Sequence, residues 1–240
     1  MNPSVVPTCR TLYPLLTAVL LAATACTHHS ATGEQSHTQH GHGAHHGAMP
    51  HRFEDAEEWA KRFDDPARDT WQKPDEVVKA LALAPDAKVA DIGSGTGYFA
   101  VRLARAVPQG RVYGVDIEPD MTRYLGERAK HEGLSNLVAV LGEPADSKLP
   151  EPVDLVLIVD TYHHIGDRVA YLKRLGEKLR PGGRVAVIDY REDSEKGPPR
   201  ENKLTPGQVR EEMEAAGYRQ ALTHDFLPHQ YFLVFERAAP

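Results

Sequence analysis

The sequence predicts an α/β fold with three layers, in which a seven-stranded, mostly parallel sheet lies between two layers of helices. Continuous apolar runs alternate with amphipathic segments between residues 88 and 190, and this alternation is typical of parallel strands that are buried on both faces. Two more strand-like runs are separated by only Leu227-Pro228-His229, a gap that permits only an antiparallel pair. The last strand is therefore expected to be antiparallel, in a C-terminal β-hairpin.

The individual elements follow from the same two patterns. Strands are expected at 88–92, 111–116, 136–141, 153–160, 184–190, 218–226 and 230–236. Helices are expected at 75–83, 96–107 and 119–133, between 160 and 181, and at 205–217. The fourth of these helices has one apolar face, made of Val169, Leu172, Leu175 and Leu179. The fifth begins with Thr205 and Gln208 at the spacing of a capping box.

Composition limits the kinds of partner that the protein can have. The chain has 240 residues, of which 41% are hydrophobic, so one domain with a substantial core and an extension is expected. The formal net charge of −6 argues against a nucleic-acid backbone as the main partner, because proteins that bind it usually carry a basic face. The two cysteines, Cys9 and Cys26, both precede the predicted domain, which therefore has no disulfide, cysteine nucleophile or cysteine metal site.

Residues 1–26 have the pattern of an export signal. Arg10 precedes an apolar stretch from Leu12 to Ala23 that is too short to span a bilayer, and small residues follow it. Residues 21–26 resemble a bacterial lipobox, which implies a lipid on Cys26 and a membrane-anchored lipoprotein exported to the periplasmic face. Two alternatives stay open: simple secretory cleavage, or a true start at Met49, which would leave the protein in the cytoplasm.

Residues 27–52 form a polar, His-rich stretch that is expected to be a disordered linker, because it has no hydrophobic period. Eight of the 13 histidines lie between His28 and His51. Neutral imidazoles bind transition metals, so this stretch could gather a metal ion. The alternative is a solvated linker with a chance bias in composition. No metal site is predicted in the folded domain.

The folded domain is expected to cover 53–240 and to begin with a helical lid, 53–83. A short helix with mixed charge comes first, and Pro74 stands at the first turn of a second helix. Trp59, Phe63 and Trp71 are interpreted as packing anchors. The alternative is that this part covers a ligand pocket, in which case the covering residues are expected at 71–74.

The stretch from Val89 to Phe99 predicts a site for a small ligand. A buried strand ends at Asp91, three alternate glycines follow, and a helix begins at once. Glycines let the backbone approach a ligand closely, and the start of a helix offers unpaired N–H groups. A dinucleotide-binding turn would need glycine in place of Tyr98, and a Walker-type loop would need a lysine, which this stretch lacks. The spacing therefore argues against pyrophosphate and triphosphate ligands.

With Asp116 at the end of the second strand and with the terminal hairpin, the pattern Asp91-x-Gly93-x-Gly95-x-Gly97 resembles the site of class I (Rossmann-like) S-adenosylmethionine-dependent methyltransferases. The resemblance covers residues 74–240 and implies S-adenosylmethionine as the cofactor. It implies that Asp91 accepts from the cofactor's ammonium group and that Asp116 accepts from its ribose hydroxyls. The loop that would hold the methionine part consists of Gly93, Ser94, Gly95, Thr96 and Gly97.

The resemblance also implies contacts with the adenine ring. Ile117 is expected to lie against the ring. An acidic residue after the third strand is expected to accept from the adenine amino group, and both Glu143 and Asp146 are candidates.

The chemistry is expected beyond the carboxyl end of the fourth strand, at Asp160, Tyr162, His163 and His164. Methyl transfer needs alignment, and it needs a base only when the acceptor must lose a proton. His163 or His164 could be that base, while Asp160 orients the acceptor or the sulfonium end of the cofactor. The alternative is that the two histidines only shape the wall of the pocket. Further candidates at the rim are Asp189-Tyr190-Arg191 and His229-Gln230-Tyr231.

The leading hypothesis is therefore a methyltransferase that acts on a small molecule and is expected to be a monomer. The rival hypothesis is an exported, tethered binding protein that has kept the fold and lost catalysis, with metal on its His-rich stretch. The intact set of Asp91, the three glycines and Asp116 favours the enzyme, because a cofactor site that is no longer used has no reason to keep that chemistry.

Overall fold

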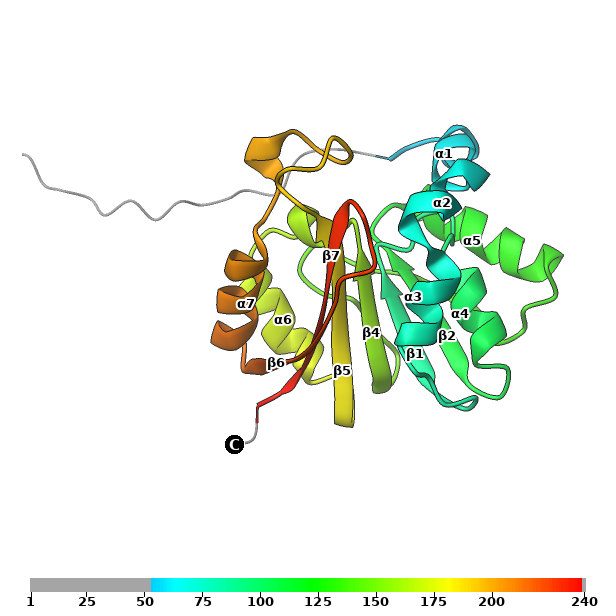
Figure 1. Ribbon diagram of the computed structural model, residues 1–240. Coiled ribbons are helices and arrows are strands. Elements are labelled where there is room, and N and C mark those ends of the chain that lie inside the picture. Colours follow the sequence, from blue (N-terminus) through cyan, green and yellow to red (C-terminus); the bar gives the residue numbers. More distant parts are fainter. Residues whose placement is uncertain (1–52, 239–240) are drawn as a thin grey trace, which may run out of the picture. The chain divides into compact units, whose positions relative to one another are not determined.

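A computed structural model describes residues 53–238, and in this range seven strands form one sheet with the order β3-β2-β1-β4-β5-β7-β6 (Figure 1). β1 to β5 run parallel, β7 is antiparallel to β5, and β6 pairs antiparallel with β7. The predicted fold class is thus confirmed. The strands are β1 (Lys88–Ile92), β2 (Arg111–Asp116), β3 (Leu137–Leu141), β4 (Val153–Val159), β5 (Leu179–Tyr190), β6 (Tyr218–His224) and β7 (Gln230–Arg237).

Helices cover both faces of the sheet (Figure 1). Two hydrophobic cores result, one between the sheet and α6 and α7, the other between the sheet and α3, α4 and α5. Because the central strands are buried on both faces, they form continuous apolar runs in the sequence. The α-helices are α1 (Ala56–Phe63), α2 (Asp69–Gln72), α3 (Pro74–Ala80), α4 (Ala100–Ala106), α5 (Pro119–His131), α6 (Arg168–Gly176) and α7 (Pro206–Ala215); short 3-10 helices are η1 (Pro66–Arg68), η2 (Tyr162–His164) and η3 (Arg200–Asn202).

The start of α4 differs from the sequence expectation. The helix begins at Ala100 rather than at Thr96. Gly95 and Gly97 have φ values of 53° and 95°, and residues with positive φ cannot belong to a right-handed helix. Residues 93–99 therefore form a loop of their own between β1 and α4, which leaves more backbone open to a ligand than a direct strand-to-helix turn would.

Leu179 also differs from the expectation, because it belongs to β5 and not to the helix before it. α6 ends at Gly176, and Leu179 pairs with Val153 of β4. The register between β4 and β5 then shifts between Val153 and Leu155. An apolar residue three or four positions after another fits a helix face and a strand equally well, so the sequence pattern alone does not separate the two.

Residues 53–73, called here the N-terminal segment, lie at the edge of the sheet where the parallel strands end (Figure 1). The expected short helix is divided into α1, η1 and α2, because Pro66 cannot continue the first helix and begins η1 instead. Lys73 ends α2 with a left-handed φ of 46°. α3 then packs into the helix layer through Val77 and Leu81, so only the part before it lies over the edge.

No helix within residues 53–238 is long and apolar enough to cross a membrane. No group of three or more His, Cys, Asp or Glu side chains in the same range is placed to hold a metal ion. The predicted signal at 1–26 and the predicted linker at 27–52 lie outside the described residues.

Candidate cofactor site and active site

The loop between β1 and α4 has a conformation that requires glycine. Gly93 and Gly97 have φ values of 73° and 95°. A β-carbon at Gly93 would lie 2.1 Å from Thr161 Oγ1, and a β-carbon at Gly97 would lie 2.4 Å from Leu125 Cδ1. Close approach and backbone conformation therefore both demand glycine at these two positions.

Two carboxylates flank this loop: Asp91, which is buried near the end of β1, and Asp116, which is partly exposed at the end of β2. Asp116 accepts hydrogen bonds from the N–H groups of Gly95 (2.8 Å) and Glu118 (3.0 Å). Burial, together with the nearby charge of Asp116, raises the pKa of Asp91 to about 7. Burial also raises the pKa of Asp116. A bound cation would offset both effects, so this pair of carboxylates is suited to a positively charged ligand.

The loop also carries polar groups that the described part of the protein leaves without partners. Ser94 Oγ and Thr96 Oγ1 are buried and have no hydrogen-bond partner among residues 53–238. Buried hydroxyls of this kind cost free energy unless something binds them. Next to Asp116, the side chain of Ile117 is 52% exposed and offers an apolar surface. These groups fit a small ligand that combines positive charge, hydroxyls and a flat ring.

Asp160, directly after β4, receives hydrogen bonds from four side chains. Its carboxylate accepts from Arg68 Nη2 (3.4 Å), Gln72 Nε2 (3.1 Å), Tyr190 Oη (3.2 Å) and Gln230 Nε2 (2.5 Å). Burial raises the pKa of Asp160 to about 6, although the charge of Arg68 opposes the rise. The residue has a φ of 53°, which is a strained conformation outside glycine. Asp160 thus joins the N-terminal segment to the ends of β4, β5 and β7.

His163 and His164 follow Asp160 in η2. The side chain of His163 is buried, and its Nδ1 lies 2.8 Å and 2.9 Å from the two carboxylate oxygens of Asp189, near the end of β5. Burial alone lowers the pKa of His163, but the hydrogen bond and charge of Asp189 outweigh burial, so the pKa is raised above 6.5. His164 lies against His163, with ring centroids 4.2 Å apart, and its ring is edge-on to Phe53. Asp189 therefore orients the imidazole of His163.

Tyr162, which the sequence suggests as a catalytic residue, lies in the core instead. Its side chain is 0% exposed and belongs to the hydrophobic core beneath α6 and α7. Its hydroxyl donates to Glu212 Oε2 of α7 at 2.8 Å. The turn of η2 directs this side chain into the core, so we assign Tyr162 a structural role.

Glu143 and Asp146, the two candidates for an adenine contact, lie in the turn after β3. Lys148 Nζ lies 3.2 Å from Glu143 Oε2 and 3.3 Å from Asp146 Oδ2. The N–H of Lys148 also donates to Asp146 and lowers the pKa of this carboxyl group. Glu143 and Asp146 share the cation of Lys148, so the structure does not decide which of them would contact the adenine.

The sequence does not single out Arg68, which the structure places at the site. Arg68 lies 92 positions before Asp160 and belongs to a segment that the sequence marks only by its aromatic residues. No local periodicity or motif contains both residues. Gln72 falls within the stretch 71–74, where a covering segment was the alternative to simple packing, and its amide indeed contacts Asp160.

Ion pairs connect the N-terminal segment to the helix layer. Arg128 Nη1 of α5 lies 2.8 Å from Asp64 Oδ1. Arg102 Nη2 of α4 lies 3.1 Å from both carboxylate oxygens of Asp69. The segment is therefore held on two sides, by α4 and α5 and by Asp160.

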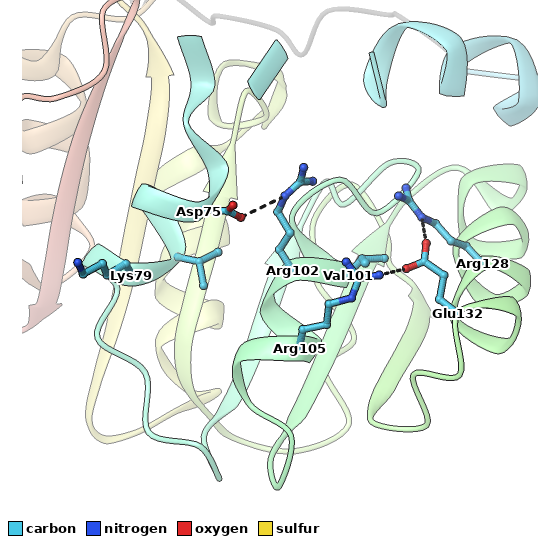
Figure 2. A pocket seen from close by; sticks show the side chains of 8 residues that line it. Asp75, Lys79, Val101, Arg102, Arg105, Arg128 and Glu132 are labelled. Carbon is cyan, nitrogen blue, oxygen red and sulfur yellow. Dashed lines mark hydrogen bonds and ion pairs between the residues drawn. The ribbon is translucent and has the colours of Figure 1, made fainter. Parts of the chain in front are cut away.

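A surface cavity of about 590 Å³ lies beside α4, and Figure 2 shows its lining. Its arginines face acidic partners: Arg102 Nε lies 3.7 Å from Asp75 Oδ1, and Arg105 and Arg128 lie 2.6 Å and 2.8 Å from Glu132. Its arginines are thus paired with acidic residues, and its lining contains none of the carboxylates at the ends of the strands. We therefore do not place the functional site in this cavity.

Comparison with known proteins relates the domain to one family. Residues 83–237 match a family model described as a methyltransferase domain. The chain is 28% identical over 121 residues to a demethylmenaquinone methyltransferase of Anoxybacillus flavithermus, covering 50% of each protein. It is 35% identical over 115 residues to a protein-L-isoaspartate O-methyltransferase of Aeropyrum pernix, covering 46% of this chain and 42% of that protein. The chain thus spans about half the length of the curated relatives that it matches.

A solved structure extends the similarity to the whole fold. A SAM-dependent methyltransferase from Aquifex aeolicus matches with a TM-score of 0.70 and 27% identity, over 75% of this chain and 97% of that one. This match supports S-adenosylmethionine, the cofactor that the sequence predicts. The ammonium, sulfonium, ribose diol and adenine of that molecule fit the carboxylates, the hydroxyls and the apolar surface around residues 91–117.

The raised pKa of Asp91 predicts that its ionised carboxylate destabilises the folded protein near neutral pH. The folded protein holds the proton more tightly than the unfolded chain does, so stability falls as pH rises from about 4 to about 7. A rise from 3.8 to about 7 corresponds to roughly 4 kcal/mol once the group is ionised. Asp91→Asn removes this cost, and we expect the melting temperature of the ligand-free protein at pH 8 to rise by about 5 °C or more.

Differential scanning calorimetry at pH 8 and at pH 5 would measure this effect. The gain is expected to shrink to less than half at pH 5, where the native carboxyl group is protonated. Asp193→Asn changes an exposed aspartate in the loop after β5 and serves as the matched control, with no gain at either pH. A lower melting temperature for Asp91→Asn at pH 8 would contradict a pKa of Asp91 that burial has raised.

Proposed function

The chain belongs to the methyltransferase-domain family, and we propose that it is an S-adenosylmethionine-dependent methyltransferase that acts on a small-molecule acceptor. The observation that carries the proposal is the group of three carboxylates around the glycine loop, of which Asp91 is buried and Asp116 and Asp160 are partly exposed. Asp91, Asp116 and Asp160 all have raised pKa values because burial removes water from them. Such a site is made for a ligand with more than one positive charge.

Different residues around the glycine loop bind different parts of the cofactor. Asp91 accepts from the ammonium group, and Asp116 accepts from the ribose hydroxyls. The N–H groups and hydroxyls of residues 93–97 surround the methionine part, and Ile117 supports the adenine. When bound, the cofactor supplies a methyl group on a sulfonium, which is already a good leaving group. The protein therefore contributes mainly alignment.

His163 and Asp189 provide a proton acceptor for substrates that must lose a proton. With Nδ1–H donated to Asp189, the neutral imidazole keeps the lone pair on Nε2. The carboxylate also stabilises the imidazolium that forms when Nε2 takes up a proton. We therefore assign the base to His163 and the orienting role to Asp189, which favours a hydroxyl or amine acceptor over one that needs no deprotonation.

We also propose that the chain is exported and carries a lipid on Cys26. The support comes from the apolar stretch between Leu12 and Ala23 and from the lipobox-like residues 21–26. The mature protein would then face the periplasm, with residues 27–52 between the anchor and the domain. A cytoplasmic protein that starts at Met49 is the alternative.

Binding of S-adenosylhomocysteine, the demethylated product, tests the cofactor site. We expect isothermal titration calorimetry of the full chain to show a clear signal, and Asp116→Asn to weaken affinity at least tenfold, because an amide offers the ribose diol one acceptor oxygen instead of two. The control variant Asp193→Asn should stay within twofold. The absence of heat from the wild type at millimolar ligand would overturn the proposed function.

An NMR titration of the His163 ring tests the assignment of the base. The pKa is expected above the ordinary value of 6.5 in the wild type, and it should fall in Asp189→Asn, because the carboxylate that stabilises the imidazolium is replaced by a neutral amide. His131→Gln, which removes a histidine at the end of α5, is the matched control and should leave the pKa of His163 unchanged. A wild-type pKa below 6.5 would contradict the role of Asp189.

Metabolic labelling tests the lipid anchor. Labelled palmitate is expected to enter the wild type and Cys9→Ser but not Cys26→Ser. Cys9 is the matched control, because it lies before the apolar stretch and would be removed with the signal. Equal labelling of both variants would rule out the lipobox.

A further inference from the structure

The N-terminal segment contacts the glycine loop directly. The ring of Phe63 lies so close to Gly95 that a β-carbon there would be 3.4 Å from Phe63 Cδ2. The hydroxyl of Tyr98, at the end of the loop, donates to Asp69 of α2. The segment thus lies over the same loop that the proposed function gives to the methionine part of the cofactor. The matching family model begins at residue 83, so it assigns no role to this segment.

Arg68 is the cation that this segment brings to the site. Its guanidinium lies over the ring of Tyr98, with Cζ 4.2 Å from the ring centroid. Its Nη1 donates to the carbonyl of Phe63 at 2.8 Å, its Nε donates to Gln72, and its Nη2 reaches Asp160 at 3.4 Å. The side chain is 16% exposed, so the group is fixed in place and largely shielded from water.

The guanidinium keeps donor capacity for a ligand. It has five N–H groups, and the three hydrogen bonds to described residues use three of them. The bond to Asp160 is long, at 3.4 Å, beside about 2.8 Å for a well-formed charged pair. Arg68 and Asp160 are therefore close to each other without forming a tight ion pair.

An amino-acid group matches this arrangement. Its carboxylate and its ammonium are attached to one carbon atom, so a protein site for it needs a cation and an anion side by side. Arg68 provides the cation. Asp160 lies at 3.4 Å from it, and Asp91 ends the strand next to the one that leads to Asp160. Carboxylates alone would bind the ammonium group but would repel the carboxylate.

We propose that Arg68 binds the carboxylate of the methionine part of S-adenosylmethionine, and that this contact holds the N-terminal segment closed over the cofactor. The inference rests on the proposed function, because it assigns one further binding residue to the same cofactor site. It makes residues 53–73 a part of that site.

The competing role for Arg68 is a latch that only holds the segment against Asp160. Two ligands separate the roles. S-adenosylhomocysteine carries the amino-acid group, whereas 5′-methylthioadenosine has the same nucleoside and thioether without that group. A carboxylate-binding arginine matters for the first ligand only, while a latch matters for both ligands equally.

The experiment is isothermal titration calorimetry of both ligands with three full-length proteins: the wild type, Arg68→Gln and Arg68→Lys. We expect Arg68→Gln to weaken S-adenosylhomocysteine about tenfold to a hundredfold, which is the range for a lost charged hydrogen bond, and to leave 5′-methylthioadenosine within threefold. Arg68→Lys keeps the charge, so its affinity for S-adenosylhomocysteine should lie between those of the wild type and Arg68→Gln. Arg62→Gln, an exposed arginine of the same segment, is the matched control and should change neither affinity.

The outcomes separate the inference from the function on which it rests. Equal losses for the two ligands in Arg68→Gln would overturn carboxylate binding and leave the cofactor site standing. A wild type that binds neither ligand would overturn the proposed function itself. Melting curves show whether each variant folds. If Arg68→Gln does not fold, Arg68→Lys provides the test. The affinity of Arg68→Lys for S-adenosylhomocysteine, divided by its affinity for 5′-methylthioadenosine, must then be lower than the same ratio in the wild type.

Discussion

The gathering of carboxylates where the parallel strands end is the constraint on which the rest of the site depends. Asp91, Asp116 and Asp160 end three neighbouring strands, and burial destabilises the ionised form of each. The protein offsets this cost only in part, with backbone N–H groups at Asp116 and with side-chain donors at Asp160. The N-terminal segment supplies two of these donors, Arg68 and Gln72. The pKa values of these carboxyl groups therefore stay raised, and a cationic ligand would lower them.

Most of the fold could be predicted from the sequence because its signals are local. A strand buried on both faces reads as a run of apolar residues, and β4 and β5 contain such runs at 155–159 and 185–188. The glycine loop could be predicted for a similar reason. The positive φ angles at Gly93 and Gly97 favour glycine, and these glycines are visible in the sequence. The capping box at Thr205 and Gln208 is present as expected, because it too involves residues three positions apart.

Other parts of the site could not be predicted, because they depend on contacts between distant residues. Nothing near Arg68 in the sequence indicates that its partner is Asp160. Tyr162, by contrast, stands next to plausible site residues, and only the turn of η2 decides that its side chain enters the core while His163 meets Asp189. Sequence proximity suggests which edge of the sheet carries the chemistry. Side-chain direction at that edge depends on packing, which one sequence does not reveal.

The ion pairs that hold the N-terminal segment have a consequence for the rate at which a spent cofactor could leave. Arg128 with Asp64 and Arg102 with Asp69 are partly exposed, so dissolved salt screens them, whereas the contact between Arg68 and Asp160 is less exposed and is screened less. In the closed arrangement that we propose, the segment covers Gly95, so the product would leave when the segment moves away. Ionic strength therefore acts on the residence time of the product more than on the alignment of the reacting groups, and a turnover limited by release would become faster as salt is added.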